Sequence, residues 1–379
     1  MVPDWYWIIF LFASGCCIGS FLNVVIYRLP RDKSIITPPS SCPSCNKQIA
    51  FYDNIPLLSW LILRAKCRHC KAPISPRYFI VELITGLLFT SLYILYFMTE
   101  ARSGLGTFTS GGWFVYLIHI TLLASLLAAS AIDLELWVIP LSVCWFATAV
   151  GIIGSTVAGA IISPADIVTY DFFPVASAQT AALAVGAAIG LAISMSLLLF
   201  GLIKRSYDTQ NSSETDDQQE ENFNHRVEML KELLFLLPIV ACSYLALYVY
   251  KSCQPVTDWW INFSQLPAVA GFLGSLYGYF IGAAIVWATR ILGTLAFGRE
   301  AMGLGDVHLM GAAGAVIGPV LVVVAFFLAP FSGLIWACFQ MFFKKTRQIP
   351  YGPFLSLGLF AVMIFHNEIR NYLSVILFH

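Results

Sequence analysis

Long apolar stretches separated by short polar segments make up most of this chain of 379 residues. A helix that crosses a membrane needs about 20 apolar residues, because each residue adds about 1.5 Å to its length. Stretches of this kind are expected at 5–27, 79–98, 113–131, 141–162, 179–203, 232–250, 267–297, 320–343 and 351–367. A Gly/Ala-rich stretch near 307–318 is too short to cross alone and predicts a half-helix or part of a broken span. The pattern predicts an all-α polytopic membrane protein with about 8–10 transmembrane helices.

Composition supports the same class. Apolar residues make up 59% of the chain and charged residues only 11%, whereas soluble domains have about 25% charged residues. A cytosolic globular enzyme is therefore excluded, and membrane lipids are expected around the chain. Lys and Arg number 21 and are balanced by 21 Asp and Glu, so a basic nucleic-acid-binding protein is also excluded and no nucleic acid partner is expected.

The positions of the basic residues predict the orientation, because Lys and Arg stay on the cytoplasmic side of membrane spans. Nine of them lie in the first polar segment: Arg28, Arg31, Lys33, Lys47, Arg64, Lys66, Arg68, Lys71 and Arg77. Placing that segment inside leaves only Arg102, Lys251 and Arg370 of the 21 outside. The N-terminus is then outside, and because Asp4 and no basic residue precedes the first apolar stretch, we expect a retained helix rather than a cleaved signal peptide.

Three polar segments interrupt the spans. Residues 28–78 carry a cysteine motif described below. Residues 204–231 are polar and acidic and predict a disordered cytoplasmic insertion, with the part from Asn222 onward running helically into the next span; partner docking is the functional alternative. Residues 251–266 are expected outside, with two tryptophans at the membrane interface.

Two CxxC pairs in the first polar segment predict a metal site. Cys42 and Cys45 are separated from Cys67 and Cys70 by 21 residues, close to the zinc-ribbon pattern. Each pair directs two thiolates at one ion, and four thiolates close a tetrahedron, so the expected Zn²⁺ is structural. Two disulfides are an alternative that a cytoplasmic location disfavours, and a redox CxxC is a second alternative. The other six cysteines lie in or beside apolar spans.

Two aspartates stand at the cytoplasmic ends of predicted spans, where a carboxylate is costly and often functional. Asp133 follows the span 113–131, and Asp306 stands at the start of the stretch near 307–318. The two share a predicted depth and side of the membrane. Two close carboxylates share a proton, so that one activates water while the other acts as an acid. Interfacial anchors and a proton-coupled transporter are the alternatives.

Motifs along the chain resemble the type 4 prepilin peptidase family, bifunctional leader peptidases and N-methyltransferases. The resemblance is carried by GSFLNVVIYRLP, by CPSC with the long run FYDNIPLLSWLILRAKCRHCKAPISPRYFIVELITG, by IDLELWVIP, by GLGDVHLM and by YGPFLSLG. GxGD alone is weakly specific, whereas the long run together with both aspartate motifs in order is strongly specific. The resemblance implies a first transmembrane helix at 1–27, a cytoplasmic zinc-binding, methyltransferase-associated domain at 28–78, and a membrane aspartic peptidase domain at 79–372.

The resemblance also implies an activity. Asp133 and Asp306 would be the catalytic pair that cleaves the leader of a prepilin or pseudopilin on the cytoplasmic side of a bacterial inner membrane, in a type IV pilus or type II secretion system. S-adenosyl-L-methionine would then serve methylation of the new N-terminus. Gly19, Asn23, Arg77 and Glu82 are the candidate cofactor-binding residues. Their structural alternatives are helix packing, an interhelical hydrogen bond and an ion pair at a helix start.

The chain departs from the family pattern at several positions. His308 stands where the family usually has Lys after the second aspartate, and Leu141 stands where the first motif usually ends in Asp. The 173 residues from Asp133 to Asp306 exceed the usual gap, and the excess maps to 155–178 and 204–266. Two alternatives stay open: a membrane transporter or assembly factor with a zinc-ribbon docking domain, and a peptidase lacking methyltransferase activity.

Overall fold

The computed structural model describes residues 2–99, 101–162, 171–207, 224–343 and 350–377, with side chains described up to residue 339 in the fourth range and up to residue 376 in the fifth. Within these ranges the regular structure is helical, and strand-like pairing is limited to two isolated bridges in the first polar segment. The predicted all-α class is therefore confirmed.

Eight of the described helices are long and apolar enough to cross a membrane, which identifies the chain as an integral membrane protein. These helices are α1 (Asp4–Arg28), α3 (Pro76–Tyr93), α4 (Gly112–Leu136), α5 (Leu141–Ile161), α7 (Ala178–Leu199), α9 (His225–Ser252), α11 (Pro267–Phe297) and α13 (Pro319–Phe343).

The last predicted span, 351–367, is interrupted. Helix α14 (Gly352–Ile364) ends at Phe365, and α15 (His366–Leu377) continues at an angle of 80° to it. The short apolar helix α12 (Leu304–Ile317) confirms that the stretch near 307–318 is helical but too short to count as a span. Among the described residues the candidate spans thus number eight, or nine if the bent pair is one span.

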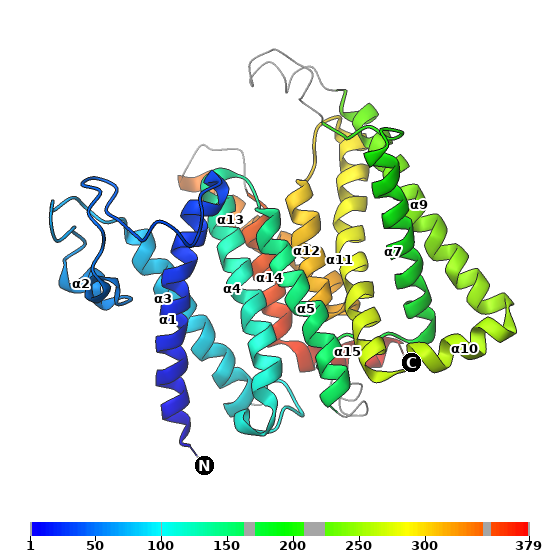
Figure 1. The fold of residues 1–379 in the computed structure, drawn as a ribbon, viewed down its shortest axis with the longest axis horizontal. Coiled ribbons are helices and arrows are strands. Elements are labelled where there is room, and N and C mark those ends of the chain that lie inside the picture. Colours follow the sequence, from blue (N-terminus) through cyan, green and yellow to red (C-terminus); the bar gives the residue numbers. More distant parts are fainter. Residues whose placement is uncertain (1, 100, 163–170, 208–223, 344–349, 378–379) are drawn as a thin grey trace. The chain divides into compact units, whose positions relative to one another are not determined.

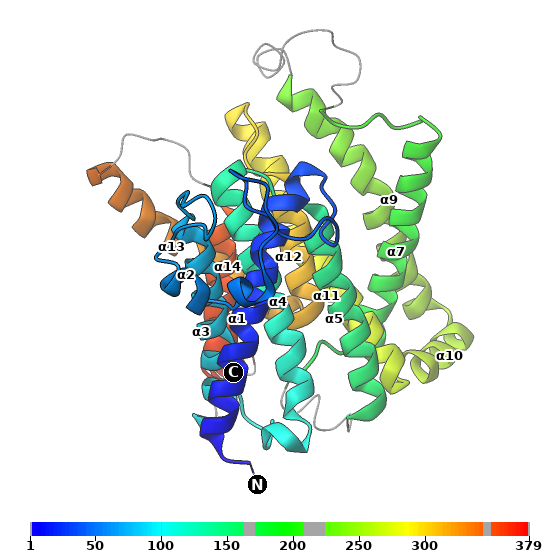
Figure 2. The same cartoon turned by 60° about the vertical axis from the view of Figure 1, so that its left-hand side comes forward.

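Helical packing divides the chain into two compact units, of which the first combines Met1–Val143 with Ala329–His379. In this unit α1 packs along α3, and both contact α4, as Figure 1 and Figure 2 show. The close approach of α1 and α3 depends on Gly19, because a Cβ at this position would lie 2.7 Å from the Cα of Glu82. Small residues allow such approaches between membrane helices, where packing rather than hydrophobicity drives association.

The second unit is Cys144–Leu328. Helix α11 packs along α12, and α7 packs along α9 and α11. A Cβ on Gly278 would collide with the carbonyl of Gly314, so these two glycines set the distance between α11 and α12. A Cβ on Gly190 of α7 would likewise collide with the backbone of Ile239 in α9. Backbone-to-backbone contact of this kind is typical of helices packed inside a membrane.

The polar insertions are partly described. Helix α9 begins at His225 and runs without a break through the predicted span, which confirms the expected helical run into it. The predicted disorder of 204–231 falls mostly on 208–223, which lie outside the described residues, as do 163–170. The segment 251–266 contains a helix of its own, α10 (Gln254–Ser264), on which the rings of Trp259 and Phe263 stack with centroids 5.3 Å apart.

Candidate active and metal sites

The two CxxC pairs fold into matching turns at 41–49 and 66–74. Each turn is flanked by one isolated antiparallel bridge. The residue after the second cysteine has a positive φ in both, 55° at Asn46 and 60° at Lys71, and its backbone N–H donates to the carbonyl of the first cysteine. Asn adopts this left-handed conformation more readily than most residues. The two halves of the metal site are therefore one local structure used twice.

The two turns bring the four predicted cysteines together. Their sulfur atoms lie within 4.8 Å of one another, and the Sγ atoms of Cys42 and Cys70 are 3.8 Å apart. Zinc–sulfur bonds of about 2.3 Å at tetrahedral angles require sulfur atoms about 3.8 Å apart. All four cysteines are free thiols, so the disulfide alternative is not realised. Donor type and spacing therefore fit a tetrahedral metal ion.

The thiols of this cluster differ in proton affinity. Backbone N–H groups of Cys45 and Ser44 lower the pKa of Cys42 to about 6. At Cys70 the backbone N–H of Ala72 lowers the pKa, but burial and the neighbouring thiols outweigh it and raise the pKa to about 11. One member is thus a thiolate at neutral pH, while another keeps its proton until a cation displaces it.

Three of the four candidate cofactor-binding residues, Gly19, Asn23 and Glu82, come together between α1 and the first two turns of α3, whereas Arg77, at the start of α3, pairs with Glu135 of α4. Asn23 is 1% exposed and donates from Nδ2 to the carbonyl of Tyr78 over 3.0 Å. Glu82 accepts from the backbone N–H of Leu57 over 2.8 Å and so holds a residue whose φ is +58°. Gly19 packs against Glu82 as described above. Buried polar groups therefore connect the first membrane helix to the loop that carries the four cysteines.

Three buried polar atoms in this cluster have no hydrogen-bond partner within the described part of the chain: Asn23 Oδ1, Trp60 Nε1 and Arg77 Nε. Buried polar groups are nearly always paired, so each of these needs an explanation. Trp60 packs on Phe79, with ring centroids 5.0 Å apart, which places it beside the start of α3. The guanidinium of Arg77 pairs with Glu135 of α4. One acceptor and two donors are thus left without a partner in the described part of the chain.

Asp133 is 7% exposed and lies in the last turn of α4. Its Oδ2 accepts from the backbone N–H of Gly352, the first residue of α14, over 3.0 Å. A Cβ on Gly352 would lie 2.7 Å from the same oxygen, so a larger residue at this position would displace the carboxylate. Nearby, Ser130 donates to Ser356 over 2.8 Å and joins the same two helices. Gly352 of the YGPF motif therefore holds the carboxylate of Asp133, the first candidate catalytic residue, in position.

Asp306 is also 7% exposed, and it is the third residue of α12. A negative charge is favoured there, because the first turn of a helix carries unpaired N–H groups and the positive end of the helix dipole. His308 contacts the hydroxyl of Tyr279 over 3.1 Å and stacks on Trp145. Asp133 belongs to the first unit and Asp306 to the second. Both carboxylates are thus buried near helix ends, each fixed by its own unit.

Several residues of these sites were missed in the sequence. Glu135 and Gly352 lie in the motifs IDLELWVIP and YGPFLSLG, but neither motif indicates their partners, Arg77 and Asp133. Arg290 was counted as one more cytoplasmic charge, yet its side chain is 1% exposed and is paired with Glu232 of α9. A signal for the last pair was present, since both residues stand within or beside long apolar stretches, where charged groups are rare.

Comparison with known proteins locates two family models on the chain. Residues 13–96 match the bacterial peptidase A24 N-terminal domain, and residues 235–338 match the type IV leader peptidase family. The first range holds the four cysteines and the cluster at the start of α3, and the second holds Asp306. No solved structure matches the chain.

Curated relatives carry the name prepilin leader peptidase/N-methyltransferase. The protein of Myxococcus xanthus is 50% identical over 135 residues, which cover 35% of this chain and 36% of that protein. The protein of Klebsiella pneumoniae is 51% identical over 89 residues, 22% of this chain and 39% of that protein. These alignments span less than half of the relatives' own length.

One relative extends the likeness along the whole chain. The prepilin leader peptidase/N-methyltransferase of Aeromonas salmonicida is 25% identical over 402 aligned positions, covering 98% of this chain and 96% of that protein. The chain is therefore similar to the type IV leader peptidase family in residues 235–338, to the bacterial peptidase A24 N-terminal domain in residues 13–96, and to a prepilin leader peptidase/N-methyltransferase along nearly its whole length.

Proposed function

We propose that this protein is a prepilin leader peptidase in which Asp133 and Asp306 form the catalytic pair. The observation that carries the proposal is the presence of two buried carboxylates near helix ends, one in each unit, in the two motifs that resemble the family's. One carboxylate accepts a proton from water as the water attacks the scissile carbonyl, and the other donates a proton to the leaving amine. The water oxygen forms the new C–O bond, and the C–N bond of the peptide breaks.

The substrate is a prepilin or pseudopilin, whose leader is cut on the cytoplasmic side of the inner membrane. An apolar pocket of about 390 Å³ in the second unit supports this proposal, because it is lined by α5, α7 and α11 and by His308, two residues after Asp306. An apolar segment beside the scissile bond would find matching surface there. The orientation with the metal-bearing loop inside and the N-terminus outside follows from the distribution of Lys and Arg.

We further propose that the four cysteines hold a structural Zn²⁺ and that the cluster at the start of α3 binds S-adenosyl-L-methionine. That cofactor supplies the methyl group for the new N-terminal amine. The unpartnered atoms of Asn23, Trp60 and Arg77 offer one acceptor and two donors, which suits the amine, carboxylate and adenine groups of such a ligand. Glu82 holds the loop at Leu57, which positions Trp60.

Leader removal from a co-expressed or purified prepilin tests the peptidase. We expect Asp133→Ala and Asp306→Ala each to lower the cleavage rate by at least about 10³-fold, because the loss of one member of a catalytic unit removes most of its effect. Asp258→Ala, an exposed carboxylate on α10, is the matched control and should cleave normally. If both catalytic variants still process the prepilin, the assignment is wrong.

The mass of the mature N-terminus tests the methyltransferase in the same samples. Wild type should add the mass of one methyl group, whereas Asn23→Ala should yield a cleaved but unmethylated product. A cleaved product without the methyl group from the wild-type enzyme would favour a peptidase lacking methyltransferase activity. Absence of cleavage by the wild type would favour a transporter or assembly factor over a peptidase.

A further inference from the structure

The position of Asp306 depends on how the chain is held between α11 and α12. Helix α11 ends at Gly298, whose φ of 69° belongs to the left-handed region that glycine adopts without cost. Residues 299–303 then lead back to α12, where Gly303 precedes the first helical residue and Asp306 follows in the first turn. Any shift of this short connection moves the carboxylate.

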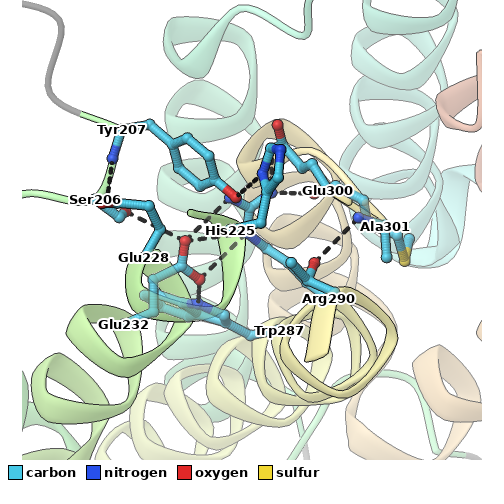
Figure 3. A network of polar contacts seen from close by, with 11 residues as sticks. Ser206, Tyr207, His225, Glu228, Glu232, Trp287, Arg290, Glu300 and Ala301 are labelled. Carbon is cyan, nitrogen blue, oxygen red and sulfur yellow. Dashed lines mark hydrogen bonds and ion pairs between the residues drawn. The ribbon is translucent and has the colours of Figure 1, made fainter. Parts of the chain in front are cut away.

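The connection is fastened at three successive residues by side chains of α11. Arg290 donates from Nη1 to the carbonyl of Met302 and to the carboxylate of Glu300. Thr294, which is fully buried, accepts at Oγ1 from the backbone N–H of Ala301 over 3.1 Å. Met302 directly precedes Gly303, so the guanidinium is bound next to the point where α12 begins. Figure 3 shows Arg290, Glu300 and Ala301 facing one another across this turn.

The other edge of the same guanidinium is bound by α9. Nε and Nη2 of Arg290 donate to Glu232 over 3.0–3.2 Å, and Glu232 is 3% exposed. Trp287 also donates to Glu232, from Nε1 over 2.7 Å, and Ser206 donates to it over 3.2 Å. The planar fork of arginine is suited to bind two partners on different edges at once, which a lysine ammonium cannot reproduce.

The segment before α9 joins the same network. The backbone N–H of Tyr207 donates to Glu228 over 2.8 Å, and the ring of Tyr207 lies 5.6 Å from the guanidinium carbon of Arg290. Lys231 pairs with Glu228 over 2.6 Å. Figure 3 places Ser206 and Tyr207 on the side of the network away from Ala301. Residues from the unusually long region 204–266 therefore provide the counter-charge for Arg290.

Stability alone is a weak reason for such a network. Burying an arginine and a glutamate costs several kcal/mol per ion before their attraction is counted, and apolar replacements are often as stable. What the ion pair provides is a fixed geometry, since it is satisfied in one arrangement of α9, α11 and the connection. We propose that Arg290, held by Glu232, is a positioning residue that sets the place of Asp306 for peptide cleavage.

This inference rests on the proposed peptidase function, and steady-state cleavage of a prepilin by the full-length protein in detergent tests it. We expect Arg290→Met, Arg290→Lys and Glu232→Gln to lower kcat by about 10–100-fold, because a misplacement of about 1 Å can cost that much. KM should stay within about threefold of wild type, since the network does not line the apolar pocket. Arg299→Lys and Arg299→Met, at an exposed arginine on the same connection, are the matched controls and should behave as wild type.

Further readouts separate positioning from general loss of structure. Methylation of an already mature pilin N-terminus should stay normal in these variants, since the proposed cofactor site lies in the first unit. Thr294→Val removes only the acceptor for Ala301 and should fold even if Arg290→Met does not; we expect its kcat to fall by about threefold to tenfold.

Three results would overturn the inference. Wild-type kcat in Arg290→Lys and Thr294→Val would show that cleavage does not depend on the hydrogen bonds from these side chains to residues 300–302. A loss of cleavage, methylation and thermal stability in parallel would show a purely structural role. Equal losses in the Arg299 variants would show a response to charge alone. Absence of cleavage by the wild type, in contrast, would count against the proposed function.

Discussion

The environment of Asp133 is set by a backbone group rather than by another side chain. Its carboxylate accepts from the N–H of Gly352 at the start of α14, 219 residues later in the chain. The N-terminus of a helix favours negative charge, so the carboxylate retains a partner although it is almost fully buried. The glycine has a steric role as well, because a Cβ at position 352 would lie 2.7 Å from Oδ2.

Gly352→Ala should therefore displace the carboxylate of Asp133. We expect leader cleavage to fall by about 10–100-fold with little loss of folded protein, because alanine is a better helix former than glycine. Cleavage rate and thermal unfolding in detergent measure the two effects. Gly333→Ala is the control, since its added Cβ would lie 3.7 Å from the ring of Phe354, an ordinary van der Waals contact. Normal cleavage by Gly352→Ala would show that cleavage does not depend on this position of the Asp133 carboxylate.

For single residues, the sequence predicted which side chains form the candidate sites better than it predicted which residues contact each other. The four cysteines were predicted from their motif, and the structure brings them together; of the candidate cofactor-binding residues, Gly19, Asn23 and Glu82 lie between α1 and α3, and Arg77 pairs with Glu135. Arg290 was missed because a basic residue at the end of an apolar stretch has two meanings, an exposed orienting charge or a buried paired one. Only its partners distinguish the two, and Glu232 is 58 residues away.

Among the elements, the two cysteine turns show how a local structure can be repeated without an obvious sequence repeat. Their side chains differ except at the cysteines and the closing Ile49 and Ile74, yet hydrogen bonds and left-handed residues recur in the same places. A metal site built this way needs little apolar core, which suits a loop of about 50 residues.

Zinc binding by these turns should release protons. Cys70, with its pKa raised to about 11, is a thiol at neutral pH, whereas Cys42, with its pKa lowered to about 6, is already a thiolate. Since a metal binds the thiolate, affinity should fall as pH falls, and more steeply below about pH 6, where Cys42 also gains a proton. Calorimetry of zinc addition to the metal-free protein should give heats that depend on the buffer's ionisation enthalpy.

The controls for this measurement come from the chain itself. Cys17→Ser, at an exposed cysteine outside the cluster, should leave the proton release unchanged. Cys70→Ser should weaken binding and reduce the number of protons released. Heats that are equal in two buffers of different ionisation enthalpy would contradict the expected protonation of Cys70.

Helix boundaries were less predictable than the helices themselves. The predicted span ends at residue 131, before the first charge, but α4 continues to Leu136 and includes Asp133, whose carboxylate accepts from the N–H of Gly352. The predicted span 351–367 contains an 80° bend after Ile364. Hydropathy averages over a window and therefore detects an apolar helix, whereas a bend or a buried charge depends on single contacts.

On the scale of the whole molecule, the two aspartates belong to different packing units. Asp133 is fixed within the first unit by α14, and Asp306 is fixed within the second by the connection from α11. Three described residues of the segment 204–266, Ser206, Glu228 and Glu232, contribute to the network beside the second of these. If the units together form one peptidase, neither carboxylate has a function without the other.

That dependence predicts a non-additive result for Asp133→Asn and Asp306→Asn. If both act on one water, each single variant loses nearly all of the catalysis, and the double variant should be only as slow as the slower single one, within about threefold. Carboxylates acting independently would instead multiply their effects. Single-turnover cleavage with excess enzyme measures the residual rates, and Asp258→Asn combined with either variant supplies the additive reference. A double variant slowed by the product of the two single effects would show that Asp133 and Asp306 do not form one catalytic pair.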